Sequence, residues 1–380
     1  MRIALLTELF LPNIGGQEIR FAEIADNLAL RGHDVEVFTI RTLDTMAEQE
    51  VRSSGAKVTR RPGVSGYQRP PGSRFPRSPW GMVRFAVAAR RWLAQQDAFD
   101  AILLNQWPLV HALALRRSDR RRAVVDWCEI RSTPPYTLFQ DFLPRMMAAN
   151  TAVSNAVAAH IEARAHRRPV VMIPSGIVLA RYHADAAETR RGILYLGRIS
   201  PHKDVPMLIA AYNVLCAAGC DEPLIIAGGG QPQVVDDINT LIAQSPYRSR
   251  IVLTGVVSEN RKIELLASAR ILAITSTREG FPRVVGEAMA SGLPTVTTRH
   301  PGNGTVGVVE EFQCGVCADP TPDAVADAIS QVLIDWNRYS VACLAQARHV
   351  DMDRVVSAFE TLLGQVADNQ SKEQVPCVSL

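Results

Sequence analysis

Residues 271–298 read ILAITSTREGFPRVVGEAMASGLPTVTT, and this stretch predicts a strand, a helix and a second strand in succession. The apolar run ILAITS has the length of a buried strand, and the Gly-Phe-Pro step after it predicts a turn. Residues 283–291 predict a helix, which Gly292 is suited to stop. PTVTT then predicts the next strand. Such a strand–helix–strand unit indicates a parallel sheet covered by helices.

The same alternation extends outward over most of the chain. The first half contains the strand-like runs RIALLT, DVEVFTI, AILLN, AVVDW and VVMIP, and the second half contains GILYLGRI, PLIIAGGG and IVLTGVV. This pattern predicts an α/β protein with two Rossmann-like, doubly wound parallel sheets, each binding ligands beyond the carboxyl ends of its strands. Periodicity is lost over residues 176–191. We therefore expect domains at 1–178 and 179–366, with a polar, disordered tail at 367–380.

The composition is typical of a soluble globular protein, with 47% hydrophobic and 21% charged residues. No apolar run approaches the roughly 18 residues needed to cross a bilayer. The N-terminus lacks the cleavage site of a signal peptide, so the expected location is the cytoplasm. The seven cysteines are scattered and predict reduced thiols. Cys314 and Cys317 form a CxxC without a second pair, which favours two small residues in an apolar stretch over zinc ligands.

The net charge of +3 hides an asymmetry between the two halves. Residues 1–180 hold 24 Lys and Arg against 16 Asp and Glu, whereas residues 181–380 hold 17 against 22. Ten of the basic residues, and no acidic ones, lie between Arg52 and Trp92. Such a field attracts an anionic partner, either an acceptor molecule or the inner face of a membrane that the protein contacts peripherally. The alternative is a solvated, arginine-rich surface.

Candidate ligand-binding side chains follow the predicted strands of the second domain. Arg198 leaves the strand GILYL, and Lys203 follows one loop later. The planar fork of Arg and the point charge of Lys suit a diphosphate, whose departure requires charge neutralisation. Glu279 lies in the loop after ILAITS, and Glu287 lies about one turn into the next helix. At this point two hypotheses stay open: the two carboxylates cut a glycosidic bond, or they hold the hydroxyls of a sugar nucleotide.

Backbone groups at two predicted helix starts are further candidates. Gly15 and Gly16 open the first helix, where unpaired N–H groups favour an anion or a sugar hydroxyl. A Gly-Gly pair is also an ordinary turn, and the GxGxxG fingerprint of dinucleotide binding is lacking. The second helix start follows Glu279, and its candidate residues are Gly280, Phe281, Pro282 and Arg283. A nucleotide base could also meet the backbone after the strand IVLTG, at Val257.

Five segments together resemble a known family. They are GGQEIRFAEIADNLALRGHDVEVFT, IPSGIVLARY, YLGRISPHKDVPMLIAAYNVL, LIIAGGG and EGFPRVVGEAMASGLPTVTT, and they occur in this order. They resemble the retaining, nucleotide-sugar-dependent glycosyltransferases of family 4, also called group 1, which have the GT-B fold. The resemblance covers about residues 1–365. Its Glu-x7-Glu motif is highly specific, and its GR…K segment is fairly specific.

The resemblance implies a role for each matching residue. Arg198 and Lys203 bind the donor diphosphate and Glu279 contacts the donor hexose, so these three are the expected catalytic residues. Glu287 holds the nucleotide ribose, and Gly16 lies near the donor phosphates. The two domains face a central cleft, the first binding the acceptor and the second a UDP- or GDP-sugar. Neither a metal ion nor another cofactor is expected, and the anomeric configuration is retained.

The sequence departs from the family pattern near the expected acceptor site. Cys128 stands where the family commonly has a His, and LLNQWPLVHALAL replaces its His-x-His segment. Ser175 and Val178 stand where an Asn and an Asp are usual. Asp126 and Glu129 flank Cys128, and we expect all three to contribute to acceptor recognition. Ordinary surface acids are the alternative interpretation of the two carboxylates.

The expected reaction is hexosyl transfer from a nucleotide diphosphate sugar to an acceptor hydroxyl on a cell-surface glycan, a glycolipid or a small natural product. Nucleic acid is not an expected partner. One alternative is a sugar-nucleotide epimerase on the same fold, which needs no acceptor. Another is a glycoside hydrolase using Glu279 and Glu287, whose carboxyl groups would then lie about 5 Å or about 6.5–9.5 Å apart. A non-catalytic binding module is a third.

Overall fold

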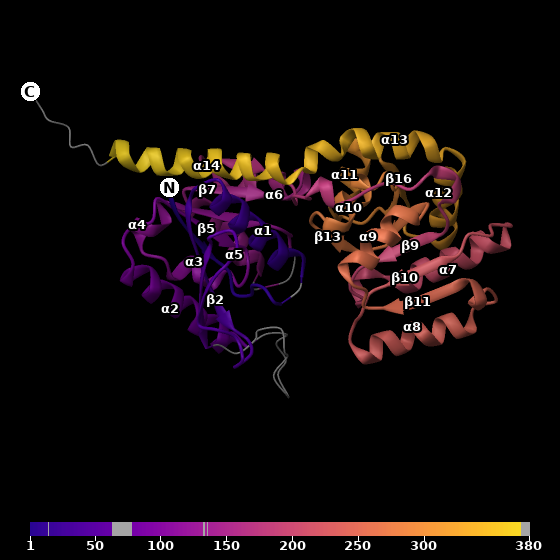
Figure 1. Ribbon diagram of the computed structural model, residues 1–380, viewed down its shortest axis with the longest axis horizontal. Helices are drawn as coiled ribbons and strands as arrows, with labels where there is room; N and C mark the ends of the chain where they lie inside the picture. Colours follow the sequence, from indigo (N-terminus) through magenta and orange to yellow (C-terminus); the bar gives the residue numbers. More distant parts are fainter. Residues whose placement is uncertain (14, 63–77, 132–133, 135, 374–380) are drawn as a thin grey trace, which may run out of the picture. The chain divides into compact units, whose positions relative to one another are not determined.

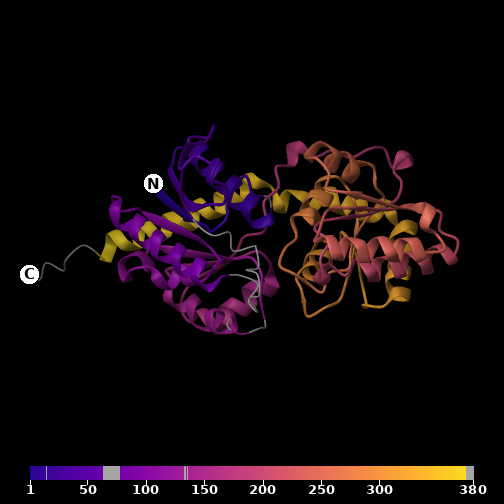
Figure 2. The ribbon, with the colours of Figure 1, turned by 90° about the horizontal axis from the view of Figure 1, so that it is seen from below.

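The computed structural model describes residues 1–380 except 14, 63–77, 132–133, 135 and 374–380. The chain divides into two compact units (Figures 1 and 2). Unit 1 contains Met1–Ile173 and Val355–Leu380, and unit 2 contains Pro174–Arg354. The division between them lies five residues before the expected one at 178. The C-terminal end differs more, because Val355 and the residues after it belong to unit 1 rather than to the second domain.

Unit 1 is built on one sheet with the strand order β3-β4-β2-β1-β5-β6-β7-β8. All neighbouring pairs are parallel except β3 with β4, an antiparallel pair at the edge. β5 and β6 are buried at every residue, as expected for strands covered on both faces. The strands are β1 Arg2–Leu6, β2 Asp34–Arg41, β3 Gln49–Val51, β4 Lys57–Pro62, β5 Ala101–Asn105, β6 Ala123–Trp127, β7 Ala149–Ala152 and β8 Val170–Met172.

Helices follow most of these strands and cover the sheet. Aromatic packing fastens one of them, since Trp92 stacks on Phe38 of β2 with ring centroids 5.1 Å apart. The helices of unit 1 are α1 Gly16–Leu30, α2 Pro79–Gln95, α3 Val110–Ala114, α4 Arg117–Arg120, α5 Tyr136–Met146, α6 Asn155–Ala165 and α14 Met352–Glu373, whose first three residues belong to unit 2.

α14 corrects the expectation of a disordered tail from residue 367. The helix continues to Glu373, and only residues 374–380 lie outside the described part of the chain. It is held to unit 1 by Phe359, which is fully buried, and by Glu360, which pairs with Arg31 at 3.0 Å and His33 at 2.8 Å. Apolar residues at helical spacing give the segment one buried face, so it packs as a helix although its C-terminal end is polar.

Unit 2 contains a second parallel sheet with the order β11-β10-β9-β12-β14-β16 and a small pair β13-β15. Strand order reverses at β9, which lies between β10 and β12, so ligands are expected at the carboxyl ends of β9 and β12. The strands are β9 Ile193–Leu196, β10 Leu224–Ala227, β11 Ile251–Gly255, β12 Ile271–Ile274, β13 Arg278–Glu279, β14 Thr295–Thr298, β15 Gly302–Asn303 and β16 Gly315–Ala318.

The core of unit 2 lies between this sheet and the helices α7 and α12, where Tyr212, Leu208 and Ile329 are fully buried. The helices are α7 Val205–Ala217, α8 Pro232–Gln244, α9 Glu259–Ser268, α10 Arg283–Ala290, α11 Thr305–Phe312, α12 Pro322–Ile334 and α13 Trp336–Gln346. Short 3₁₀ turns occur at Leu179–Arg181, Ala187–Thr189, Pro201–Lys203, Arg248–Arg250 and Ala347–Val350. The predicted α/β class with two doubly wound sheets is confirmed.

Candidate active site

Lys203 and Glu279 form an ion pair at the point where the strand order of unit 2 reverses. Lys203 ends the 3₁₀ turn after β9, and Glu279 ends β13, which follows β12. The Lys203 Nζ donates a hydrogen bond to Oε1 of Glu279. Their side chains are 20% and 11% exposed, so the pair is largely shielded from solvent but keeps some surface that a ligand can contact. Two of the three residues expected to be catalytic are therefore brought together.

Asp204 fixes the loop that carries Lys203. Its backbone is left-handed, with φ of 46°, and its carboxylate accepts a hydrogen bond from the backbone N–H of Met207 at the start of α7. The Thr275 hydroxyl donates to the carbonyl oxygens of Asp204 at 2.8 Å and Lys203 at 3.2 Å. The loops after β9 and β12 are thus hydrogen-bonded to each other, which fixes the position of Lys203 relative to Glu279.

Arg198 lies exposed at the head of the same loop. The glycines after β10 run so close to this loop that side chains would collide with it: a Cβ on Gly228 would lie 1.8 Å from the carbonyl oxygen of Gly197, and one on Gly230 would lie 2.2 Å from that of Ile199. Ile199 N–H also donates to the carbonyl of Gly229 at 2.8 Å. The close approach of the two loops therefore requires glycine at 228 and 230.

The segment from Gly280 to Arg283 connects β13 to α10. The Gly304 N–H donates to the carbonyl of Glu279 at 2.8 Å, and a Cβ on Gly304 would lie 2.1 Å from the carbonyl oxygen of Gly280. Phe281 is buried and Pro282 precedes the first helical residue, Arg283, whose guanidinium donates to the carbonyl of Gly176 at 2.8 Å. Helix starts leave backbone N–H groups without intrahelical acceptors, so this segment suits a phosphate or a hydroxyl.

Glu287 on α10 is 5% exposed and already has a cationic partner. The Lys262 Nζ on α9 lies 2.9 Å from its Oε1 and 2.8 Å from Oε2 of Glu259. Burial lowers the pKa of Lys262, but the Glu287 and Glu259 carboxylates and Tyr182 together outweigh burial. The net direction is upward, so this ammonium stays charged. Burial, followed by the Glu287 charge, raises the pKa of the Tyr182 phenol. Sequence analysis assigned no role to Lys262 or Tyr182.

The remaining donor-binding candidates lie at strand and helix ends as expected. Val257 is half-buried two residues after β11, beside Val256, which is 84% exposed. Gly15 caps α1, and Gly16 is its first residue. The carboxylate of Glu18 occupies the space beside Gly15, since a Cβ there would lie 2.2 Å from its Oε2. An acid in the first turn supplies the negative charge that a helix start attracts.

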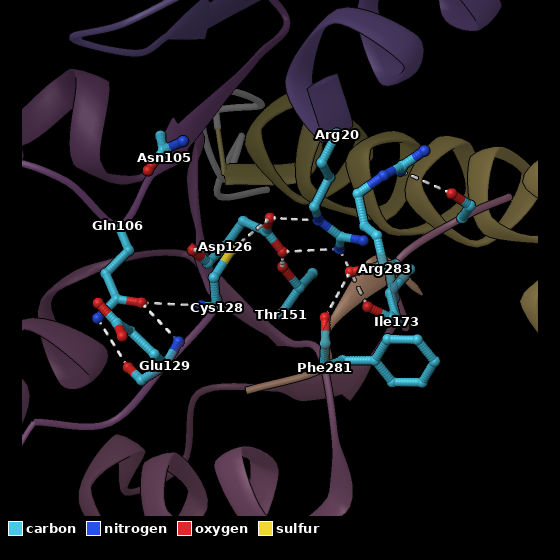
Figure 3. A network of polar contacts seen from close by, with 12 residues as sticks. Arg20, Asn105, Gln106, Asp126, Cys128, Glu129, Thr151, Ile173, Phe281 and Arg283 are labelled. Carbon is cyan, nitrogen blue, oxygen red and sulfur yellow. Dashed lines mark hydrogen bonds and ion pairs between the residues drawn. The ribbon is translucent and has the colours of Figure 1, made fainter. Parts of the chain in front are cut away.

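Asp126 in unit 1 is fully buried, and both of its carboxylate oxygens are bonded (Figure 3). Arg20 of α1 donates to Oδ2 at 2.8 Å and to Oδ1 at 3.0 Å, and Thr151 donates to Oδ1 at 2.6 Å. Arg20 also donates to the carbonyl of Ile173 at 3.0 Å. Burial lowers the pKa of Arg20, but the charge and the hydrogen bonds of Asp126, with smaller contributions from Cys128 and Glu23, give a net upward shift, so the guanidinium stays charged. This geometry gives Asp126 a structural role and does not support its direct contact with an acceptor.

Cys128 and Glu129 are held by Gln106, which follows β5. Its Oε1 accepts from the backbone N–H of Cys128 at 2.8 Å and of Glu129 at 3.0 Å, and its Nε2 donates to the Glu129 carbonyl at 2.8 Å (Figure 3). Burial, followed by the Asp126 charge, raises the pKa of the Cys128 thiol well above its usual range. The thiol is therefore neutral. The Glu129 side chain pairs with Arg131 at 2.8 Å.

Six cysteines within the described part of the chain are free thiols, and Cys377 lies outside it. No group of three or more His, Cys, Asp or Glu side chains within the described ranges is placed to hold a metal ion. No helix in that part of the chain is both long and apolar enough to cross a membrane.

Two family models match successive parts of the sequence. The model described as Glycosyltransferase Family 4 matches residues 14–181, and the model described as Glycosyl transferases group 1 matches residues 181–349. The chain belongs to the group 1 / family 4 glycosyltransferases. The motif residues Arg198, Lys203, Glu279 and Glu287 of this glycosyltransferase all lie within the second match.

Two curated relatives resemble the glycosyltransferase over most of its length, and a third resembles part of it. A GDP-mannose-dependent alpha-(1-6)-phosphatidylinositol dimannoside mannosyltransferase of Mycobacterium tuberculosis is 24% identical, covering 97% of each chain. An MMP alpha-(1->4)-mannosyltransferase of Mycolicibacterium hassiacum is 26% identical over 88% of each chain. An alpha-D-kanosaminyltransferase of Streptomyces kanamyceticus is 30% identical, covering 38% of this chain and 36% of its own.

Solved structures show the same fold. Sucrose-phosphate synthase of Thermosynechococcus elongatus has a TM-score of 0.79 at 18% identity, covering 96% of this chain and 98% of its own. Anabaena HepE in complex with UDP-glucose has a TM-score of 0.71 at 19% identity, covering 98% and 100%. The GT-B fold expected for the glycosyltransferase is thereby confirmed.

Proposed function

We propose that this glycosyltransferase moves a hexosyl group from a UDP- or GDP-sugar to an acceptor hydroxyl, with retention of the anomeric configuration and without a metal ion. The observation that carries the proposal is the Lys203–Glu279 pair at the strand-order reversal of unit 2, with Arg198 exposed on the same loop. This is where an open parallel sheet offers its binding site. The two cations there suit the diphosphate of a nucleotide sugar, and the carboxylate suits the hydroxyl groups of its hexose.

The proposed step breaks the bond between the anomeric carbon and the β-phosphate oxygen, and the nucleotide diphosphate leaves with the electron pair. The acceptor oxygen forms the new bond on the same face of the sugar. A diphosphate oxygen takes the acceptor's proton. Arg198 and Lys203 neutralise the charge that develops on the leaving group, and N–H groups at the start of α10 add hydrogen bonds. Glu279 holds the hexose, and Glu287 holds the ribose.

The state of the two glutamates argues against the hydrolase alternative. A retaining or inverting hydrolase needs one carboxyl group protonated to act as an acid. Here Glu279 is paired with Lys203 and Glu287 with Lys262, so each carboxylate already has a different cation as its partner. Two glutamates engaged in separate ion pairs support binding of hydroxyl groups instead.

We further propose that the acceptor is bound at an anionic membrane surface in the cytoplasm, through α2. Trp80, Val83 and Val87 are 78%, 44% and 41% exposed and have helical spacing, so they form one apolar stripe. Arg84 and Arg91 are exposed beside it. A basic helix with an exposed apolar face suits the interface of a bilayer with anionic lipids. Residues 63–77 of the basic stretch lie outside the described part of the chain.

A binding and turnover experiment tests the proposed reaction. Thermal unfolding is followed with UDP and with GDP, and the better ligand then selects the sugar nucleotides for turnover with an acceptor panel. We expect one nucleotide diphosphate to raise the melting temperature, and NMR of the product to show the donor's anomeric configuration. Donor incubated alone should give no isomer. Absence of binding at millimolar concentration, or an inverted product, would overturn the proposal.

A further inference from the structure

A cavity of about 810 Å³ lies in unit 1, and six arginines line it. They come from three separate places in the sequence: α4 and the turn after it, the end of α5, and the turn after α6. The arginines are Arg117, Arg120, Arg121, Arg145, Arg167 and Arg168. None of the side chains that line the cavity within the described part of unit 1 is acidic. Nothing in the proposed transfer reaction uses this cluster.

The cavity lies at the amino ends of strands. Arg121 precedes β6, Ala149 begins β7 directly after Ala148, and Pro169 precedes β8. Asp126 and Cys128 are at the carboxyl end of β6, on the opposite edge of the same sheet. Because the strands of this part of the sheet are parallel, the cavity is separate from the edge where a doubly wound sheet binds its substrate.

One wall of the cavity is a face of α14. Leu362, Gln365, Val366 and Asn369 line it at the spacing of a single helical face. Leu362 and Val366 are buried and Ala149 is fully buried, so the floor is apolar while the rim is basic. Charges beside an apolar, weakly polarisable floor act on a ligand more strongly than charges in open water.

Five of the six arginine side chains, all but that of Arg120, are exposed. Arg120 is half-buried, and its guanidinium donates a hydrogen bond to the carbonyl of Leu113. Two acidic residues, Asp119 and Asp368, are each adjacent in sequence to a residue that lines the cavity. The six arginines still outnumber these two acids. So many like charges around one hollow repel each other unless an anion joins them, and the planar fork of Arg matches phosphate oxygens.

We propose that this cavity binds a molecule that carries two or more phosphate groups, at a site distinct from the donor site. The ligand's phosphates contact the arginines at the rim, and its remaining part lies on the apolar floor against α14. A soluble organic phosphate and the headgroup of a phospholipid share this chemistry. The ligand joins α14 to the rest of unit 1, so its binding stabilises that contact.

Inorganic pyrophosphate is the first probe, because it is small enough for both the cavity and the diphosphate clamp of unit 2. Its binding is measured by calorimetry on the full chain and on three variants. The cavity variant is Arg117→Gln/Arg121→Gln/Arg168→Gln, and the clamp variant is Arg198→Gln/Lys203→Gln. A matched control removes the same charge from exposed arginines of unit 2: Arg248→Gln/Arg338→Gln/Arg348→Gln. Unfolding midpoints of all variants establish that each is folded, and single Arg168→Gln serves if the triple variant is not.

We expect two equivalents of pyrophosphate on the wild type and on the control, and one on each of the other variants. The cavity site should weaken by more than about tenfold in the cavity variant and should weaken with added salt. Two equivalents on the cavity variant, or equal losses in the cavity variant and the control, would overturn the proposal. A wild type that binds a single equivalent, which is kept in the clamp variant and lost in the cavity variant, would instead count against the proposed function, so the two failures are distinguishable.

Vesicles identify the source of the phosphate. Co-sedimentation is compared for phosphatidylcholine vesicles with and without cardiolipin, whose headgroup carries two phosphates. All chains in this comparison also carry Trp80→Ser/Val83→Ser, so that the α2 contact does not contribute. A cavity variant that loses both pyrophosphate and vesicle binding, with the control unaffected, assigns the site to a lipid headgroup. A variant that loses only pyrophosphate assigns it to a soluble phosphate compound. A cavity variant that loses neither overturns the proposal.

Discussion

The ammonium group of Lys262 lies 2.9 Å from the carboxylate of Glu287, so the acid expected to hold the donor ribose has a half-buried cation beside it. This contact fixes the carboxylate in one position before any ligand arrives. It also makes Lys262, which belongs to no recognised motif, part of the machinery that positions Glu287.

Removing this cation should destabilise unit 2. Lys262→Gln leaves Glu287 buried with a weaker partner, and we expect the free energy of unfolding to fall by about 2 kcal/mol in urea denaturation. Arg261→Gln is the control, because Arg261 is adjacent in α9 but its pair with Glu264 is exposed. Its effect should stay below about 0.5 kcal/mol. Equal effects of the two changes would show that the Lys262 contact contributes nothing.

Substitutions of the two glutamates of the Glu-x7-Glu motif should have different kinetic effects. Glu279→Ala removes the group assigned to the reacting hexose, so we expect kcat to fall by about 100-fold with little change in donor affinity. Glu287→Ala removes the group assigned to the ribose, so we expect donor affinity to weaken by about tenfold with a smaller change in kcat. Donor binding by calorimetry and steady-state rates measure both. Equal losses of turnover at unchanged donor affinity would contradict these roles.

Asp126 should matter for stability rather than for acceptor binding. Asp126→Asn leaves Arg20 buried without its counter-charge, and we expect the free energy of unfolding to fall by about 3 kcal/mol. Asp141→Asn is the matched control, since Asp141 forms an exposed pair with Arg164 at 2.7 Å. Chemical denaturation measures both. If Asp126→Asn leaves stability unchanged but raises the KM for acceptor, Asp126 contacts the acceptor after all.

His111 should make unit 1 sensitive to acid. Burial against Phe85 lowers the pKa of His111 to about 3, whereas an unfolded His titrates near 6.5. The unfolded chain therefore binds a proton first, and stability is lost as pH falls below about 6.5 towards 3. Between about pH 7 and about pH 5 the loss is about 2 kcal/mol. His111→Phe should remove that part of the pH dependence in urea titrations. An unchanged pH dependence in this variant would contradict the assignment.

The α2 stripe should carry vesicle binding. Trp80→Ser/Val83→Ser removes the apolar contact, and we expect co-sedimentation with phosphatidylglycerol vesicles to fall by about tenfold or more. Val252→Ser/Leu344→Ser is the control, because both residues are exposed apolar positions of unit 2. Rates with a soluble acceptor should be unchanged in both variants. Vesicle binding that is equal in both would show that α2 is not the contact.

The fold was predictable from sequence because its signals are local. Continuous apolar runs such as AILLN and AVVDW are strands buried on both faces, and their lengths separate them from the helices between them. The Glu279 loop and the Arg198–Lys203 loop were located correctly for the same reason, since each follows a strand directly. The antiparallel β3 was not predicted, because its three residues carry no periodicity of their own.

The partners of the site residues were not predictable, because each depends on contacts between distant segments. Arg20 reaches Asp126 over 106 positions in the sequence, and Lys262 reaches Glu287 over 25. The sequence placed Asp126 beside Cys128 without showing that its carboxylate points into the core. Gln106 was passed over because an amide that holds a neighbouring loop has no motif. The last helix was expected in the second domain but packs on unit 1. An apolar residue such as Phe359 gives the same sequence pattern whichever unit it packs against.

The return of α14 to unit 1 has a consequence for synthesis on the ribosome. Unit 2 is one uninterrupted stretch of chain, so it can complete its core as soon as that stretch has emerged. Unit 1 cannot, because the surface that receives Phe359 stays uncovered until α14 has been translated after unit 2. Of the two units, the one whose translation starts earlier is therefore completed later.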